Sequence, residues 1–196
     1  MRIKYFTGLI ILLIFSCNQS AKQTISKATD STTTAKTAGT ATYLAWDSVK
    51  LNGTIPMLYS FKTTEEKLGK ADSIVTPNYE DVSSSFFNGK NFKYSYFKGI
   101  TFEKSNDTIA FSSIDFTKNP AAYFGNDHIR LNNATTLSDF KKIFPNATDD
   151  SLSVLGIGKT RAVSLAISKK ETEDKWLFIF KEDGSKLLRI EYWIPD

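Results

Sequence analysis

The stretch Trp176–Pro195, WLFIFKEDGSKLLRIEYWIP, is the part of the sequence that decides the predicted fold. Its first five residues are all apolar, and Glu182-Asp183-Gly184-Ser185 is typical of a hairpin turn. After the turn, two sets of residues alternate: Leu188, Ile190, Tyr192 and Ile194 with Arg189, Glu191 and Trp193. Alternation of this kind indicates a strand with one face in the core. The stretch therefore predicts an antiparallel hairpin.

The same kind of pattern recurs upstream. Three segments alternate or are apolar in a manner that predicts strands: 92–96, 100–102 and 109–116, with a turn at 105–107, and a further alternating segment covers 163–167. Two short helices are also predicted. One begins with the capping-box pattern Thr63-Thr64-Glu65-Glu66 and ends near Leu68, and the other begins at Thr136 and is stopped by Pro145.

A helix followed by antiparallel strands thus occurs twice along the chain. The order predicts an α+β fold, in which an antiparallel sheet carries short helices on one face. The two helix starts lie 73 residues apart, which favours a duplication with halves at 43–118 and 119–196. Ordinary hairpin periodicity can imitate such a repeat, so both interpretations stay open at this point.

Short motifs in this part of the chain resemble the β-lactamase-inhibitor-protein-like fold, which is shared by small outer-membrane assembly lipoproteins of the SmpA/OmlA type. Helices in that family often end in Leu-Gly-x-Pro-Asp, and Leu68-Gly69-Lys70-Ala71-Asp72 matches except at Ala71. Ile143-Phe144-Pro145-Asn146 is a looser counterpart in the second half. The resemblance covers about residues 63–196 and implies a non-enzymatic protein that binds another protein, often across a concave sheet.

The N-terminus has the features of an export signal. Arg2 and Lys4 precede an apolar run, Gly8–Phe15, which is shorter than the roughly 20 residues of a membrane span. Ile14-Phe15-Ser16-Cys17 resembles the bacterial lipobox. That resemblance implies a lipid on Cys17, cleavage just before it, and attachment of the mature protein to a membrane. An uncut anchor helix is the alternative.

The segment 18–42 is rich in Ser, Thr, Ala and Lys, and Ile25 is its only large apolar residue. Such a composition cannot bury enough apolar surface to fold, so it predicts a flexible tether between the signal, residues 1–17, and a globular domain at 43–196. The residues after Cys17 lack the Asp that commonly marks retention in the inner membrane. We therefore expect an outer-membrane lipoprotein, facing either the periplasm or the outside.

The charge balance excludes an electrostatic nucleic-acid binder. The whole chain has a formal charge of +4, and without Arg2 and Lys4 it keeps 23 basic and 21 acidic residues. The two signs are interspersed, whereas nucleic-acid-binding domains gather basic residues on one face.

No pattern for catalysis or for a cofactor is present. His128 is the only histidine, no Gly-x-Ser-x-Gly motif occurs, and Cys17 is the only cysteine. Gly156-Ile157-Gly158-Lys159-Thr160 lacks the first glycine of a phosphate-binding loop. The acidic runs at 149–150, 171–174 and 182–183 lack the ligand spacing of a calcium loop. We expect no cofactor, no metal and no enzymatic activity.

The remaining candidates for function are surface aromatic and charged residues near the end of the chain. If Leu188, Ile190 and Tyr192 face the core, then Arg189, Glu191 and Trp193 face outward. Trp176 lies on the neighbouring strand. Trp and Arg are enriched at binding hot spots. We expect these four residues to bind an envelope protein, unless Trp193 packs against the other half of the domain or under a loop. A carbohydrate-binding module that uses the same tryptophans, or a hydrolase that uses carboxylates or His128, is the alternative.

Overall fold

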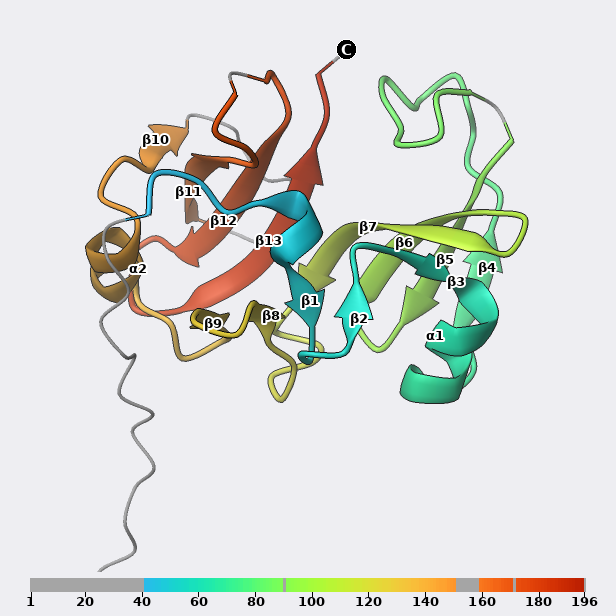
Figure 1. The fold of residues 1–196 in the computed structure, drawn as a ribbon, viewed down its shortest axis with the longest axis horizontal. Helices are drawn as coiled ribbons and strands as arrows, with labels where there is room; N and C mark the ends of the chain where they lie inside the picture. The colour runs from blue at the N-terminus through green and yellow to red at the C-terminus, as the bar shows by residue number, and fades with distance from the viewer. Residues whose placement is uncertain (1–40, 90, 151–158, 171, 196) are drawn as a thin grey trace, which may run out of the picture. The chain divides into compact units, whose positions relative to one another are not determined.

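The main element of the computed structural model is a nine-stranded antiparallel sheet (Figure 1). The structure describes residues 41–89, 91–150, 159–170 and 172–195, which belong to one compact unit of the chain, residues 34–196. The large sheet contains β3 (Leu58–Ser60), β4 (Ser73–Val75), β5 (Lys93–Phe97), β6 (Ile100–Ser105), β7 (Thr108–Asp115), β10 (Thr148–Asp150), β11 (Thr160–Ala166), β12 (Lys175–Lys181) and β13 (Leu187–Trp193). Its order is β10–β11–β12–β13–β7–β6–β5–β4, and β3 also pairs with β7.

Four strands of two residues each form a second, smaller sheet. They are β1 (Lys50–Leu51), β2 (Ile55–Pro56), β8 (Phe124–Gly125) and β9 (Arg130–Leu131), in the order β2–β1–β8–β9. The helices among the described residues are the 3-10 helix η1 (Trp46–Ser48) and two short α-helices, α1 (Phe61–Leu68) and α2 (Leu137–Ile143). The fold is therefore sheet-rich α+β, as the sequence predicts.

The hairpins predicted from alternation are confirmed. The β5–β6 hairpin turns through Lys98 and Gly99, both with positive φ (44° and 84°), which is the backbone that a two-residue turn requires. Asn106 and Asp107 turn β6 into β7 within the predicted turn. In the β12–β13 hairpin, Gly184 adopts a positive φ of 71°, as expected for the glycine of such a turn.

The prediction that Leu188 faces the core is wrong. A register shift lies in the pairing with β12: Phe180 is opposite Leu187 and Ile179 is opposite Arg189, so Leu188 is an extra residue. This β-bulge turns Leu187 into the core, fully buried, whereas Leu188 stays half-buried. The alternation of apolar and polar residues cannot reveal a bulge, because the residues after the bulge alternate between the two faces as in a regular strand.

Both helices form, and one begins earlier than predicted. In α2, the side chain of Thr136 accepts a hydrogen bond from the Asp139 backbone N at 3.1 Å, as a helix cap does. In α1, the cap is Ser60 and not Thr63, because the Ser60 hydroxyl accepts from the backbone N of Thr63. The helix therefore begins at Phe61.

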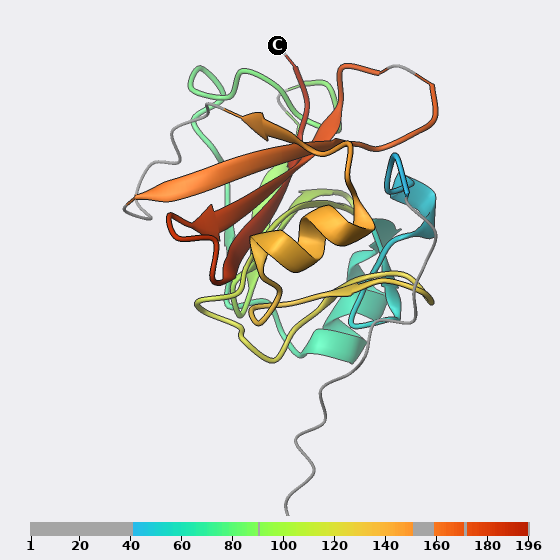
Figure 2. The same ribbon diagram turned by 90° about the vertical axis from the view of Figure 1, so that its left-hand side faces the viewer.

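The core contains buried side chains from the large sheet, the small sheet and α2, and Phe61 of α1 packs against it. Phe140 of α2 contacts Phe178 and Phe180 of β12, and Figure 2 shows α2 beside the sheet that contains this strand. Phe124 of the small sheet contacts Trp176 of β12, with ring centroids 5.0 Å apart. Phe61 of α1 contacts Phe97 of β5.

Strand β7 joins two sets of strands. Four strands, β4 to β7, follow α1 along the chain, and four, β10 to β13, follow α2. The last strands of the two sets, β7 and β13, pair with each other: residues 189–191 of β13 lie opposite residues 113–115 of β7. Residues 108–110 of β7 pair with β3, along the same edge of β7 that pairs with β13. The pairing of β13 with β7 therefore ends at Glu191, and β13 diverges from β7 beyond that residue (Figure 1).

The predicted signal, Cys17 and most of the predicted tether lie outside the described residues. At the end of that tether, the backbone N of Ala41 donates to the carbonyl of Ile143 in α2. Leu44 and Trp46 donate in the same way to Ala166 and Ile167. The chain is thus hydrogen-bonded to the domain from residue 41 onward, two residues before the predicted start of the domain.

Candidate binding surface and pocket

Strands β12 and β13 have two different faces. Trp176, Phe178 and Phe180 point into the core, and the residues between them point to the opposite, outer face. In the register of the hairpin, Lys175 is opposite Trp193, Leu177 is opposite Glu191 and Ile179 is opposite Arg189. Arg189, Glu191 and Trp193 therefore lie together on the outer face, as the alternation predicts. With Lys175 they are called the outer strip below.

Trp193 is partly exposed and is held by a cation. The Nζ of Lys175 lies over its ring, 4.6 Å from the centroid, and the same Nζ forms a 2.7 Å ion pair with Asp150 of β10. The side chains of Lys175 and Asp150 are only 28% and 12% exposed. A cation close to an aromatic face is attracted by the ring quadrupole. The indole is thus fixed in place while part of its surface faces solvent.

Arg189 and Glu191 form the second half of the outer strip. The Nε of Arg189 lies 2.6 Å from Oε1 of Glu191, and their side chains are 31% and 27% exposed. A guanidinium nitrogen of Arg189 also donates to the hydroxyl of Ser113 on β7, at 3.3 Å. The pair spans the seam between β13 and β7. The charges of this pair compensate each other, and the charge of Lys175 is compensated by Asp150 of β10.

The fourth predicted binding residue, Trp176, lies elsewhere. Its side chain is completely buried on the core face, and its Nε1 donates to the carbonyl of Leu44 at 2.7 Å. Its ring stacks on Trp46 at 5.1 Å between centroids. A side chain without exposed surface offers nothing to a partner in this conformation, so Trp176 belongs to the core and not to the candidate surface.

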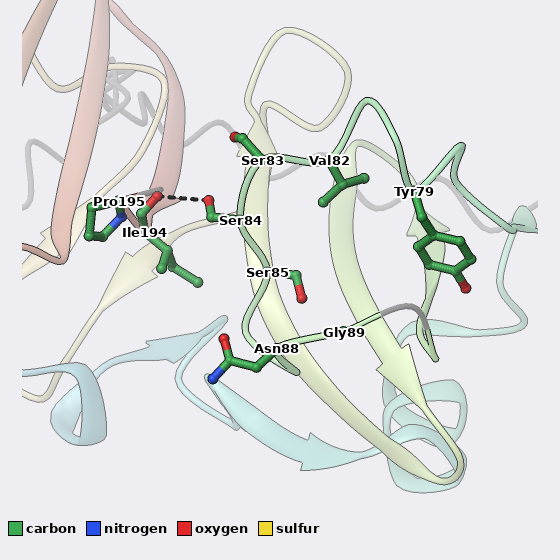
Figure 3. A pocket seen from close by; sticks show the side chains of 9 residues that line it. All are labelled: Tyr79, Val82, Ser83, Ser84, Ser85, Asn88, Gly89, Ile194 and Pro195. Atoms are coloured by element: carbon green, nitrogen blue, oxygen red, sulfur yellow. Dashed lines mark hydrogen bonds between the residues drawn. The ribbon is translucent and has the colours of Figure 1, made fainter.

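A pocket of about 380 Å³ opens where β13 leaves β7 (Figure 3). One wall is the β4–β5 loop, residues 76–92, of which residue 90 lies outside the described part. The other wall is the segment after β13, Ile194 and Pro195. The hydroxyl of Ser84 donates to the carbonyl of Ile194 at 2.8 Å and so connects the two walls.

One polar atom in this pocket has no partner. Ser85 is 7% exposed, and its hydroxyl forms no hydrogen bond with any described residue. Burial of an unsatisfied hydroxyl costs about 1–3 kcal/mol, and such groups in folded proteins usually have a partner. The pocket therefore has a free donor and acceptor at its buried end.

Below the loop lies a buried carboxyl group, Glu103 of β6. The backbone N of Phe86 donates to its Oε2 at 2.9 Å, and the N of Phe87 also donates to it. Glu103 is 7% exposed and sits between Tyr94 on β5 and Ala110 on β7. Burial raises the pKa of Glu103 to about 7, against the two backbone hydrogen bonds, which lower it. The loop is thus attached to the sheet through a carboxyl group that titrates near neutral pH.

Two tyrosines near Glu103 are also perturbed. Burial raises the pKa of Tyr94, and the neighbouring Glu103 carboxylate adds to that effect. Burial likewise raises the pKa of Tyr192, whose hydroxyl donates to Asp174 at 2.7 Å. Both phenols therefore stay protonated at neutral pH. The charge of Glu103, in contrast, changes near neutral pH.

Among the described residues, those considered for catalysis or metal binding do not come together in one site. His128 is exposed in the turn between β8 and β9, where its backbone N donates to the side chain of Asn126. Asp149 pairs with Lys141 and Arg161, and Asp183 pairs with Lys181. Within the described ranges, no group of three or more His, Cys, Asp or Glu residues is placed to hold a metal ion.

Two of these features, the Ser85 hydroxyl and the Glu103 carboxyl, were not identified from the sequence. Ser85 is one of three consecutive serines in a loop, and Glu103 alternates with Phe102 on a strand, so each has the pattern of a solvated residue. The only available signal is the aromatic content of the loop, since Phe86 and Phe87 indicate that it packs on something.

Comparisons with known proteins add no family: no protein-family model, no curated protein and no solved structure matches this chain. Among the described residues, none of the helices has the length and apolar character needed to cross a membrane.

Proposed function

We propose that this protein is a non-enzymatic lipoprotein of the cell envelope that binds another protein through the outer strip. The observation that carries the proposal is the partly exposed Trp193, held by Lys175 beside the Arg189–Glu191 pair. Tryptophan and arginine are the residues most enriched at the energetic centres of interfaces. A pre-positioned indole loses little conformational entropy when a partner covers it.

The internal repeat of the chain and the placement of its two helices are also proposals. We infer that the chain is a duplication in which both helices lie on one face of the large sheet, opposite the face that carries the outer strip. Two sets of a helix and four antiparallel strands, which meet at β7 and β13, support this inference. So do the contacts of α1 and α2 with core-facing phenylalanines of β5 and β12. This arrangement is in line with the β-lactamase-inhibitor-protein-like fold that the motifs resemble.

The lipid anchor rests on Cys17 and the residues before it. We propose that the diacylated cysteine anchors the domain to the outer membrane and that residues 18–40 are the tether between the lipid and the domain. Two or three acyl chains hold a protein stably, because each buried methylene contributes about 0.8 kcal/mol.

For this anchor, we expect Cys17→Ser to abolish the mass increment of lipid on the mature N-terminus and to shift the protein out of the membrane pellet. Intact-mass spectrometry and fractionation of cells that produce each form would measure this. Ser16→Ala keeps a small residue before the cysteine and is the control, which should remain lipidated. An unmodified Cys17 with the leader still attached would contradict the anchor.

For the binding surface, we expect Trp193→Ala to weaken capture of the partner from crosslinked, solubilised envelopes by about tenfold or more. Quantitative mass spectrometry of the captured proteins would measure the loss. Leu58→Ala is the matched control, because Leu58 is a large apolar side chain, 45% exposed, outside the outer strip. Equal capture by both variants, or no stoichiometric partner at all, would remove the support for a protein-binding function.

The alternatives have less support. A carbohydrate-binding module would have to stack sugars on both tryptophans, but Trp176 is buried and only Trp193 has exposed surface. A hydrolase would need a base beside a nucleophile, and His128 has only its backbone hydrogen bond to Asn126 among the interactions of the described residues.

A further inference from the structure

The pocket between the β4–β5 loop and the C-terminal segment has the composition of a ligand site distinct from the outer strip. In Figure 3, Tyr79 and Val82 lie on one side of it, Ile194 and Pro195 on the other, and Ser85 between them. Its volume of about 380 Å³ falls within the range of small-molecule pockets, about 300–1,000 Å³.

Among the described residues that line this pocket, all polar side chains are uncharged. The Ser85 hydroxyl can both donate and accept, and it has no partner among the described residues. The Ser84 hydroxyl donates to Ile194 and keeps lone pairs that can accept. Asn88, at the exposed rim, carries both a donor and an acceptor. A charged ligand would find no countercharge on the described side chains of the lining, whereas a ligand with several hydroxyl groups would match them.

The apolar part of the lining is fixed in place. The hydroxyl of Tyr79 donates to the carbonyl of Phe92 at 2.6 Å, so its ring, and not its hydroxyl, is what it can offer to a ligand. Tyr79 also contacts the Phe92 ring, with centroids 5.7 Å apart. The loop is anchored further along by the Phe86–Glu103 hydrogen bond. A pre-formed wall of this kind reduces the ordering that binding requires.

We propose that this pocket binds a neutral carbohydrate unit, whose hydroxyl groups pair with Ser85, Ser84 and Asn88 and whose C–H face packs on the apolar walls. A sugar ring combines those two surfaces in one small, uncharged molecule. The proposal is independent of the outer strip, because it names another set of residues on another part of the molecule.

The test is a titration of the full-length protein in detergent micelles with the neutral methyl glycosides of glucose, galactose, mannose and N-acetylglucosamine. Ligand-observed NMR would detect binding and calorimetry would measure the dissociation constant. We expect at least one glycoside to bind, and Ser85→Ala to raise its dissociation constant about tenfold or more. Ser138→Ala, on the exposed surface of α2, is the matched control and should leave the dissociation constant unchanged.

Thermal unfolding of the same variants separates a binding role from a structural one. The hydroxyl of Ser85 has no partner to lose, so Ser85→Ala is expected to melt at the same temperature as the parent protein or higher. Lost binding with an unchanged or higher melting temperature supports the site. Failure of all four glycosides to bind, binding that Ser85→Ala leaves intact, or equal binding of an anionic sugar such as methyl glucuronide would overturn the proposal.

Discussion

Replacement of Trp176 by alanine is expected to lower the free energy of unfolding by about 3–5 kcal/mol, the usual range for a large aromatic residue deleted from a core. The side chain is fully buried, and its ring contacts Phe111, Phe124 and Tyr192 at centroid distances of 5.0–6.0 Å. The variant would also leave the Leu44 carbonyl without its indole donor. The loss would therefore combine a cavity with an unsatisfied buried acceptor.

Denaturant unfolding, followed by circular dichroism, would measure this effect. Trp193→Ala is the internal comparison, and we expect it to cost less than about 1 kcal/mol, because Trp193 lies on the partly exposed outer strip. Trp176→Phe should fall between the two, since it keeps most of the apolar volume but not the donor. Similar losses for both alanine variants would mean that the two tryptophans do not differ in burial as described.

A second large effect is expected from Glu103, in the pH dependence of stability. Its pKa is about 7 in the folded protein against an ordinary value of 4.5, so the folded state holds the proton more tightly than the unfolded state. Stability from this group is therefore fully present below pH 4.5, falls as the pH rises toward 7, and is level above that. The difference amounts to about 3 kcal/mol.

Glu103→Gln removes the charge and keeps an oxygen that can accept from Phe86. We expect this variant to match the parent protein near pH 4.5 and to be more stable than it at pH 8, by up to about 3 kcal/mol. Urea unfolding across pH 4.5–8 would measure the difference. Glu66→Gln, at an exposed position of α1, should follow the parent curve. Parallel curves for Glu103→Gln and the parent protein would show that Glu103 is not buried as a neutral acid.

Much of the large sheet was predictable because its strands are long enough to show a period. The alternation in β5, β6, β11 and β13 covers five to seven residues each, and turn residues such as Gly184 mark the ends. The small sheet has strands of two residues, which cannot show a period. It is held by tertiary contacts, such as Phe124 against Trp176, that involve residues far apart in the sequence.

The candidate site was predictable only in part, for a related reason. Alternation gives the relative faces of Arg189, Glu191 and Trp193 on one strand. Alternation does not predict the faces of β12, because both faces of this strand are covered. Leu177 and Ile179 on the outer face are as buried as Trp176 and Phe178 on the core face. A strand buried on both sides is apolar throughout, so its sequence does not show which side faces the core.

The proposed function requires a protein partner that contacts the outer strip. Its most direct test is in-cell photo-crosslinking from a photoreactive phenylalanine analogue placed at position 193, with the same analogue at position 58 as the control. The proposed function predicts one dominant crosslinked protein from position 193, with a markedly weaker product or none from position 58. No crosslink from position 193, or the same set of products from both positions, would contradict it.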